Sequence, residues 1–216
     1  MSGFYTPGVS SETYTPDKLL AGCDVITRQE TIAAGANLAR GTLLGRITLG
    51  AATGTKASGT GDGTIGDVTL GAKAQVGTYV LTCTATAGNG GTFSVFAPDG
   101  TRLKDLTVAV AYTSPHINLT VADGSADWGA GAVINVVVAA GSGKLIKSLA
   151  AAVDGSQTPV AILADYAAAA SSDVLAGTYH SGEFDESAIV FGTGHTAAST
   201  RAGLRALGIH LKSAQL

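Results

Sequence analysis

Charged residues are scarce in this chain of 216 residues. Lys, Arg, Asp and Glu together make up 13% of it, about half the usual share, and 13 basic against 16 acidic residues leave a formal net charge of −3. Such a sparse and slightly acidic charge provides no basic surface that could hold a phosphate backbone. We therefore expect no direct nucleic-acid partner.

Long hydrophobic runs are also missing. The most apolar run, residues 132–140, is interrupted by Asn135 and is roughly half as long as a membrane-spanning helix. Residues 1–22 do not contain a basic stretch followed by an apolar one, which a secretory signal would have. We expect neither a signal peptide nor a membrane partner.

Metal-binding and redox motifs are absent as well. Cys23 and Cys83 lack the spacing of metal ligands; a disulfide between them is open, but two buried thiols in a reducing compartment fit the pattern better. Four aspartates lie in Gly-rich turns without the spacing of a calcium-binding loop, so that turn formation explains them equally well. They are Asp62, Asp67, Asp123 and Asp127. We expect no metal and no cofactor.

The chain lacks the short motifs of common enzymes: GxSxG, HExxH, CxxC, and GxGxxG after a strand. Gly141-Ser142-Gly143-Lys144 fails as a phosphate loop, because Leu145 stands where a Ser or Thr would hold magnesium. A hydrolase using Ser156 with His195 and an acid is an alternative, but no nucleophile elbow or oxyanion-hole motif accompanies these residues. We expect no enzyme and no catalytic residue.

Three further features allow both a structural and a functional interpretation. Glu183, Asp185 and Glu186 suit a solvated turn better than a pair of general acids, which would need a pocket that separates their pKa values. His195 precedes a helix start, where a capping or turn role is sufficient. Trp128 is the single tryptophan and is expected to anchor a core; if exposed, it would be a platform for a sugar ring.

Small residues are abundant instead: 37 Ala, 30 Gly and 26 Thr. In residues 78–86, Tyr79, Leu81, Cys83 and Ala85 alternate with threonines, which is typical of a half-buried strand. We expect one helix, from a cap near Thr196 to Gly208, in a mainly β chain. Strand patterns occur at residues 25–32, 38–39, 42–44, 92–96, 106–111, 117–121, 133–138, 159–163, 174–180, 187–191 and 209–211.

Composition divides the chain. Residues 1–21 contain Pro, Gly and Ser without any period and predict an extended arm, and Gly-rich stretches at 51–66 and 139–144 predict two necks of an inserted module. We therefore expect a discontinuous frame, residues 22–57 and 143–216, and an inserted β-sandwich, residues 58–142. The expected insert has six acids and three bases, so that it carries the whole net charge of −3.

The expected frame resembles the lambda-type head decoration proteins of tailed bacteriophages, and the insert looks like the immunoglobulin-like sandwiches of phage structural proteins. The resemblance is expected to end at the insert. It depends on the order and spacing of Val25-Ile26-Thr27, Leu38-Ala39-Arg40-Gly41-Thr42-Leu43-Leu44-Gly45, the run from Asp154 to Ala164, Ser181-Gly182-Glu183-Phe184 and Leu204-Arg205-Ala206-Leu207-Gly208-Ile209.

The resemblance implies a small β-rich, β-tulip-like fold that assembles as a homotrimer. Such a trimer would sit at the local threefold positions of the expanded capsid and stabilise the head against the pressure of packaged DNA. The expected site is the arm, with Phe4, Tyr5, Thr6, Pro7 and Tyr14 contacting the major capsid protein. The protein would lie on the outer surface of the virion, after assembly in the host cytoplasm.

Two other functions remain open. The insert is able to serve as a carbohydrate- or cell-surface-binding module, with the frame as its mount; an exposed Trp128 would favour this and a buried one would weigh against it. Composition also permits a fragment of a secreted β-rich adhesin, against which the expected lack of a signal peptide argues.

Overall fold

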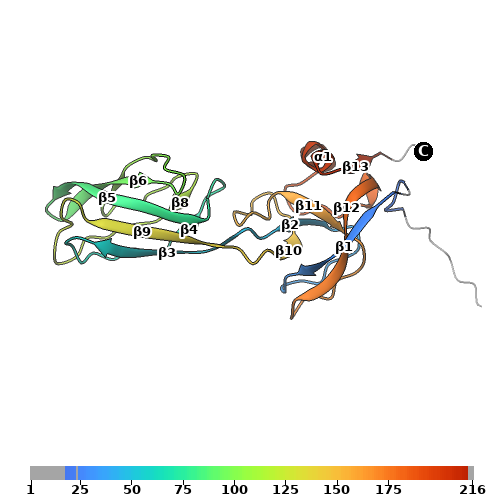
Figure 1. The fold of residues 1–216 in the computed structure, drawn as a ribbon, viewed down its shortest axis with the longest axis horizontal. Coiled ribbons are helices and arrows are strands. Elements are labelled where there is room, and N and C mark those ends of the chain that lie inside the picture. Colours follow the sequence, from blue (N-terminus) through green and yellow to red (C-terminus); the bar gives the residue numbers. More distant parts are fainter. Residues whose placement is uncertain (1–17, 23, 214–216) are drawn as a thin grey trace, which may run out of the picture.

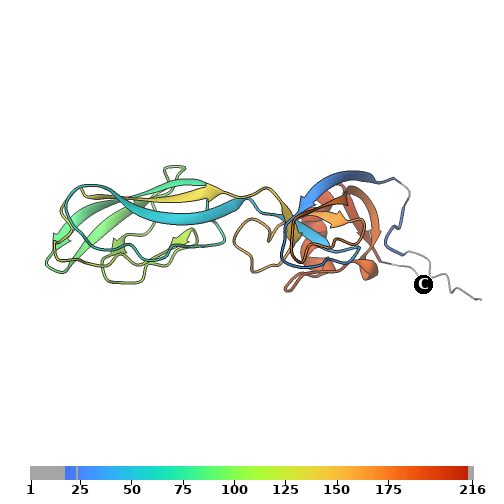
Figure 2. The same ribbon diagram turned by 90° about the horizontal axis from the view of Figure 1, so that it is seen from below.

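A computed structural model describes residues 18–22 and 24–213, which form β-strands, one α-helix and one short 3-10 helix. Strands from residues 26–46 and 145–212 form one sheet, and strands from residues 49–140 form two others. We call the first part the barrel region (residues 18–48 and 141–213) and the second the two-layer region (residues 49–140). They lie end to end in Figures 1 and 2. The predicted mainly β fold with one C-terminal helix is confirmed.

The barrel region is a six-stranded sheet in the order β1-β10-β2-β11-β12-β13, which closes because β1 also pairs with β12. Pairs β1–β10 and β12–β13 are parallel and the others antiparallel. The strands span β1 (Ile26–Ile32), β2 (Leu43–Arg46), β10 (Leu145–Lys147), β11 (Pro159–Leu163), β12 (Val174–Asp185) and β13 (Ile209–Lys212). Because β1 and β2 precede residue 49 and the rest follow residue 140, neither segment can close the barrel alone.

Two small cores stabilise this region. One contains Ile32, Leu44, Leu145 and Leu163 with several alanines, and the other lies beneath α1 (Ala197–Ala206). The helix starts as predicted, because the Thr196 hydroxyl accepts the Ser199 N–H in a capping box.

The predicted strand at residues 187–191 is wrong. A 3-10 helix, η1 (Glu186–Ala188), lies there, because the Asp185 carboxylate accepts the N–H and the hydroxyl of Ser187 and so forms a helical turn.

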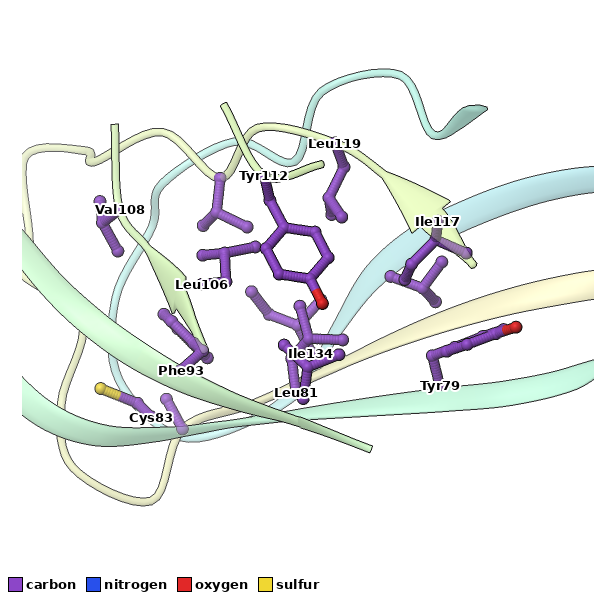
Figure 3. Packing of buried hydrophobic residues seen from close by; sticks show 14 of the residues in the cluster. Tyr79, Leu81, Cys83, Phe93, Leu106, Val108, Tyr112, Ile117, Leu119 and Ile134 are labelled. Carbon is purple, nitrogen blue, oxygen red and sulfur yellow. The ribbon is translucent and has the colours of Figure 1, made fainter. Parts of the chain in front are cut away.

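The two-layer region has an antiparallel sheet in the order β3-β9-β5-β6-β7 and a two-stranded sheet, β4-β8. Its strands span β3 (Leu49–Ser58), β4 (Thr69–Leu70), β5 (Gly77–Ala87), β6 (Gly90–Phe96), β7 (Leu106–Thr107), β8 (Ile117–Asn118) and β9 (Val133–Ala140). Tyr79, Leu81 and Cys83 face a common core, as their alternation predicted (Figure 3). The strand predicted at 106–111 ends early because Ala109 has a φ of 63°.

Trp128 is fully buried in this core, as predicted. Its ring packs edge-on against Phe93, with 5.4 Å between centroids, and its indole N–H donates to the Ala122 carbonyl at 3.0 Å. Cys83 is a free thiol in the same core, where burial raises its pKa. Cys23 lies outside the described residues.

The predicted neck at residues 51–66 is wrong, since β3 occupies its first part and pairs with β9. The chain crosses between the regions at 47–48 and 141–144 instead. These segments pair with each other: Ile47 N–H donates to Lys144 O, Gly143 N–H to Ile47 O and Gly141 N–H to Thr48 O, each at 2.9 Å. The true neck is therefore a short two-stranded ribbon.

Candidate functional site

The described chain begins next to the end of β12. Leu19 and Ala21 form backbone hydrogen bonds with Asp185 and Glu183, at 3.0 and 2.9 Å, in the manner of an extra strand. Leu19 is 2% exposed and packs in the core beneath α1. Any segment that precedes Leu19 is thus attached to the barrel through both backbone and core contacts.

The predicted arm residues Phe4, Tyr5, Thr6, Pro7 and Tyr14 lie outside the described residues. What the structure adds is the point of attachment. Beside it is a groove of about 360 Å³, lined by Gly22, Asp24, Ser181, Gly182, Glu183, Gly208 and His210. The attachment at Leu19 was not predicted from the residue pattern, although the apolar Leu19-Leu20 pair after a polar segment is a signal for it.

The three acids predicted to lie in a solvated turn each have a partner. Glu183 pairs with Lys212, and Glu186 pairs with Arg201. Asp185 is only 8% exposed, so a solvated turn is the wrong description for it; the Ser187 N–H lowers the pKa of its carboxyl. These carboxylates hold the end of β12 and η1 in place.

Ser156 and His195 are not paired. The Ser156 hydroxyl donates to Asp154 Oδ1 at 2.6 Å, whereas His195 Nε2 lies 3.1 Å from Oγ of the fully buried Ser148. The Ser148 hydroxyl donates to the Ser156 carbonyl at 2.7 Å. The two residues of the alternative hydrolase, Ser156 and His195, thus belong to a hydrogen-bonded set that ties two loops together.

Two glycines allow this close packing. A Cβ at Gly45 would lie 1.9 Å from the Ser156 carbonyl oxygen, and one at Gly192 would lie 1.8 Å from that of Ser148. Strand β2 and the loop between η1 and α1 can approach the serines only without a side chain at these positions.

No group of three or more potential metal ligands occurs within residues 18–22 and 24–213. Asp62 accepts hydrogen bonds from the Ser125 hydroxyl and the Ala126 N–H, at 2.6 and 2.8 Å, and Asp127 accepts one from the Asn89 N–H at 2.9 Å. These aspartates stabilise loops of the two-layer region.

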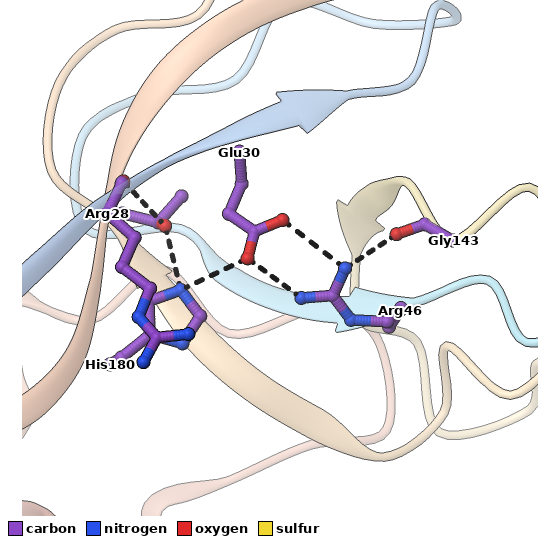
Figure 4. A network of polar contacts seen from close by, with 6 residues as sticks. Arg28, Glu30, Arg46, Gly143 and His180 are labelled. Carbon is purple, nitrogen blue, oxygen red and sulfur yellow. Dashed lines mark hydrogen bonds and ion pairs between the residues drawn. The ribbon is translucent and has the colours of Figure 1, made fainter.

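A polar network connects the neck to the barrel (Figure 4). The Arg46 guanidinium, at the end of β2, donates to the Gly143 carbonyl at 2.6 Å and to both carboxylate oxygens of Glu30, at 3.0 and 3.3 Å. The Thr48 and Leu49 N–H groups donate to the Asp154 carbonyl, at 2.8 and 2.9 Å, from the other side. Both strands of the neck are therefore bonded to the barrel.

His180 adjoins this network, with Nε2 3.7 Å from Glu30 Oε1 and 3.1 Å from the Thr178 hydroxyl. Its pKa is lowered, chiefly by burial and further by Arg28 and Arg46, against the opposing effect of Glu30. The hydrogen bond from Arg46 lowers the pKa of Glu30. An anionic Glu30 and a neutral His180 are the preferred pair.

Within the described part of the chain, α1 falls well short of the length and hydrophobicity of a transmembrane helix. No curated protein matches the chain. A solved structure, FlgL of Xanthomonas campestris, is 14% identical over 48% of this chain and 34% of that chain, with a TM-score of 0.33. This likeness is too weak to support an argument.

Residues 110–211 match the family described as bacteriophage lambda head decoration protein D. The match includes three of the segments that carry the resemblance, at 154–164, 181–184 and 204–209, and all strands of the barrel from β10 onward, ending within β13. It also takes in residues 110–142, where no resemblance was expected. Through this match residues 110–211 are similar to the lambda head decoration protein family, in line with the resemblance of the expected frame.

Proposed function

We propose that this protein binds the expanded phage head as a homotrimer at local threefold positions and stabilises the shell against the pressure of packaged DNA. The family match supports the general role, that of a structural capsid decoration protein located on the virion. The trimer, its position and its mechanical role are our proposal. Contacts repeated by the lattice would give avidity that a single contact lacks.

The observation that carries the proposal further is the attachment of the chain at Leu19. A decoration protein that grips the capsid through an arm must transmit load to its own fold. The Leu19 carbonyl accepts the Asp185 N–H and the Ala21 N–H donates to the Glu183 carbonyl; together with the buried Leu19 side chain, these bonds would provide that transmission. We assign capsid binding to the arm of residues 1–21, with Phe4, Tyr5 and Tyr14 adding a strand to the major capsid protein.

The geometry supports an outward orientation of the two-layer region. Leu19–Ala21 pair with β12 beside β13, and β13 lies at the end of the barrel away from the two-layer region (Figure 1). If the arm faces the capsid, residues 49–140 project from the outer surface of the head. We propose that they are an immunoglobulin-like module, with domain boundaries at 48/49 and 140/141 in place of 57/58 and 142/143.

The candidate residue for a carbohydrate- or cell-surface-binding module, Trp128, is not accessible to a ligand. A sugar platform needs an exposed aromatic ring, and the single tryptophan, Trp128, is fully buried. We therefore keep cementing of the capsid as the function.

The test is co-sedimentation with expanded heads that lack their decoration protein. The full chain should bind saturably, and a chain that lacks residues 1–17 but keeps Leu19 should bind at least tenfold more weakly. Keeping Leu19 matters, because its loss would open the core and confuse arm removal with unfolding. A full chain that does not bind overturns the proposal, and undiminished binding of the shortened chain overturns the role of the arm.

A second variant separates the two regions. Gly141 N–H bonds to Thr48 O, so an Asn-Gly turn can replace residues 49–140 and rejoin the barrel. This variant should bind heads as well as the full chain does. A folded variant that fails to bind would show that the two-layer region contacts the capsid.

A further inference from the structure

The four asparagines of the chain lie in different surroundings. The side-chain carbonyls of Asn37 and Asn118 each accept a backbone N–H, at 3.1 and 2.9 Å. Asn135 lies in β9, which pairs with β3 on one side and with β5 on the other. Asn89 is exposed, and its side-chain amide has no hydrogen-bond partner among the described residues. Asn89 is therefore the asparagine whose side chain is least restrained.

Asn89 lies in the turn between β5 and β6, at the end of the two-layer region away from the barrel (Figure 1). Ala87 pairs with Gly90, so this turn consists of Gly88 and Asn89 alone. Asn89 has a φ of 55°, a left-handed conformation that Asn adopts more readily than most residues. Asn89-Gly90 is also the single Asn-Gly step of the sequence. The unbonded amide is thus followed directly by a peptide nitrogen that no Cβ shields.

The tip of this hairpin has less support than the rest of its sheet. The pairing of β5 with β9 ends at Thr82, and the register between β5 and β6 shifts between Cys83 and Ala85. Beyond this shift β5 pairs with β6 alone, and its residues up to Ala87 are exposed. A two-stranded extension with few buried contacts opens more readily than the body of a sheet. Such opening gives the Asn89 side chain the freedom to reach the next peptide nitrogen.

We propose that Asn89 is a site of spontaneous deamidation. The Gly90 backbone nitrogen attacks Cγ of Asn89, so that a bond forms between these two atoms. The bond between Cγ and Nδ2 breaks, and ammonia leaves with the proton of the peptide nitrogen. Water then opens the cyclic imide: opening at the former side-chain carbonyl gives Asp, and opening at the backbone carbonyl gives isoaspartate. No electrons are exchanged, and water is the co-reactant.

The modification would reach the core through Asp127. The Asn89 N–H donates to Asp127 Oδ1 at 2.9 Å, and the next residue, Trp128, is fully buried in the core of the two-layer region. Both products put a negative charge on the residue that is bonded to this carboxylate, and like charges repel. Isoaspartate also lengthens the main chain of a two-residue turn by a carbon atom, which displaces the Asn89 N–H. The tip should therefore loosen from the loop that carries Trp128.

The first experiment is incubation of the purified full chain at mildly alkaline pH, where the attacking nitrogen loses its proton more readily, followed by peptide mass spectrometry. Tryptic cleavage after Lys73 and Arg102 separates Asn89 from the other asparagines, which serve as internal controls. The mass increase of an amide-to-acid exchange should appear at Asn89 at least tenfold faster than in the peptides of the controls. No conversion at Asn89, or equally fast conversion at another asparagine, overturns the proposal.

Two substitutions in the same turn test the route through the Gly90 nitrogen. Gly90→Ala places a methyl group beside that nitrogen and should slow the conversion by tenfold or more, whereas Gly88→Ala keeps the Asn-Gly step and should leave it fast. The fold tolerates both, since neither glycine has a positive φ. A Cβ at Gly90 would meet only the Ala87 Cβ at 3.6 Å and the Gly88 carbonyl oxygen at 4.0 Å, and one at Gly88 would meet nothing within 4 Å. Equal rates in the two variants overturn the proposal.

The expected loosening is measured on incubated protein by denaturant unfolding, followed by Trp128 fluorescence. Converted wild type should unfold at a lower denaturant concentration than fresh wild type. Gly90→Ala, incubated in the same way, should match its own fresh sample. Equal midpoints for converted and fresh wild type would overturn the coupling of the tip to the core. None of these measurements requires phage heads, so their outcome is independent of the proposed capsid binding.

Discussion

The two regions of this protein are stabilised in different ways. The barrel region has two small cores, one of aliphatic residues and alanines and one that also contains Tyr179 and Phe184, and its β1 and β2 are far in sequence from β10 to β13. The two-layer region is contiguous and has one core with the largest buried side chains, Trp128, Tyr79 and Phe93. A contiguous region with its own core can be inserted without weakening the host fold, provided that its ends are neighbours. Thr48 and Gly141 meet this condition.

Because the two regions have separate cores, we expect them to unfold independently. Large-to-small substitutions in these cores have the largest expected effect. Phe93→Ala should destabilise the two-layer region by about 3–5 kcal/mol, and Leu163→Ala should destabilise the barrel by about 2–5 kcal/mol, since both side chains are fully buried. Trp128 fluorescence reports the first region, and helical circular dichroism from α1 reports the second. Each substitution should shift one signal. Joint shifts would contradict independent unfolding of the two regions.

The neck is the place where the two regions could be uncoupled. Arg46→Ala removes hydrogen bonds to Glu30 and Gly143 and should destabilise the barrel by about 1–3 kcal/mol. It should also broaden the distribution of orientations between the regions, which small-angle scattering measures. Arg46→Lys, which keeps the charge but not the forked geometry, should lie between wild type and Arg46→Ala. An unchanged scattering profile would show that the ribbon alone fixes the orientation.

Local signals predicted elements within each region better than the boundary between the two regions. The capping residue Thr196 and the alternation around Leu81 were sufficient to predict α1 and β5, because both patterns act within one element. Strand β3 was predicted as part of a neck, because Thr-Gly-Thr-Lys-Ala-Ser has no apolar alternation and becomes a strand only by pairing with β9. Long-range register is not visible in a local pattern.

The candidate site shows the same limit. The family resemblance identified the barrel, which the match to residues 110–211 supports. It could not predict that Leu19 fills the core beneath α1, nor that Arg46 links Glu30 to Gly143, because each contact joins residues from distant segments. The expected arm residues stay a prediction.

Acidification should lower the stability of the barrel region more than that of the two-layer region. Burial lowers the pKa of His180 below its ordinary 6.5, so the unfolded chain takes up this proton first and barrel stability falls as the pH drops below about 6.5. The lowered pKa of Glu30 adds a second loss at more acidic pH, as Glu30 is protonated. Thermal unfolding should be measured from pH 8 to pH 5. Over this range the midpoint temperature followed by helical circular dichroism should fall, and the midpoint followed by Trp128 fluorescence should stay nearly constant. His180→Gln should abolish the first loss.

The smallest expected effect lies in the core of the two-layer region and concerns two tyrosines. The Tyr112 hydroxyl is buried and has no hydrogen bond of normal geometry among the described residues: burial raises its pKa, and the Ser114 side chain opposes this only in part. The Tyr79 hydroxyl, in contrast, accepts the Gln75 N–H at 2.9 Å. An unpaired buried hydroxyl is costly and a paired one is not, so Tyr112→Phe should stabilise the region by about 1 kcal/mol and Tyr79→Phe should destabilise it by a similar amount. Denaturant unfolding followed by Trp128 fluorescence measures both. If Tyr112→Phe destabilises the region, the hydroxyl has a partner such as an internal water, and the core is less dry than its aromatic packing indicates.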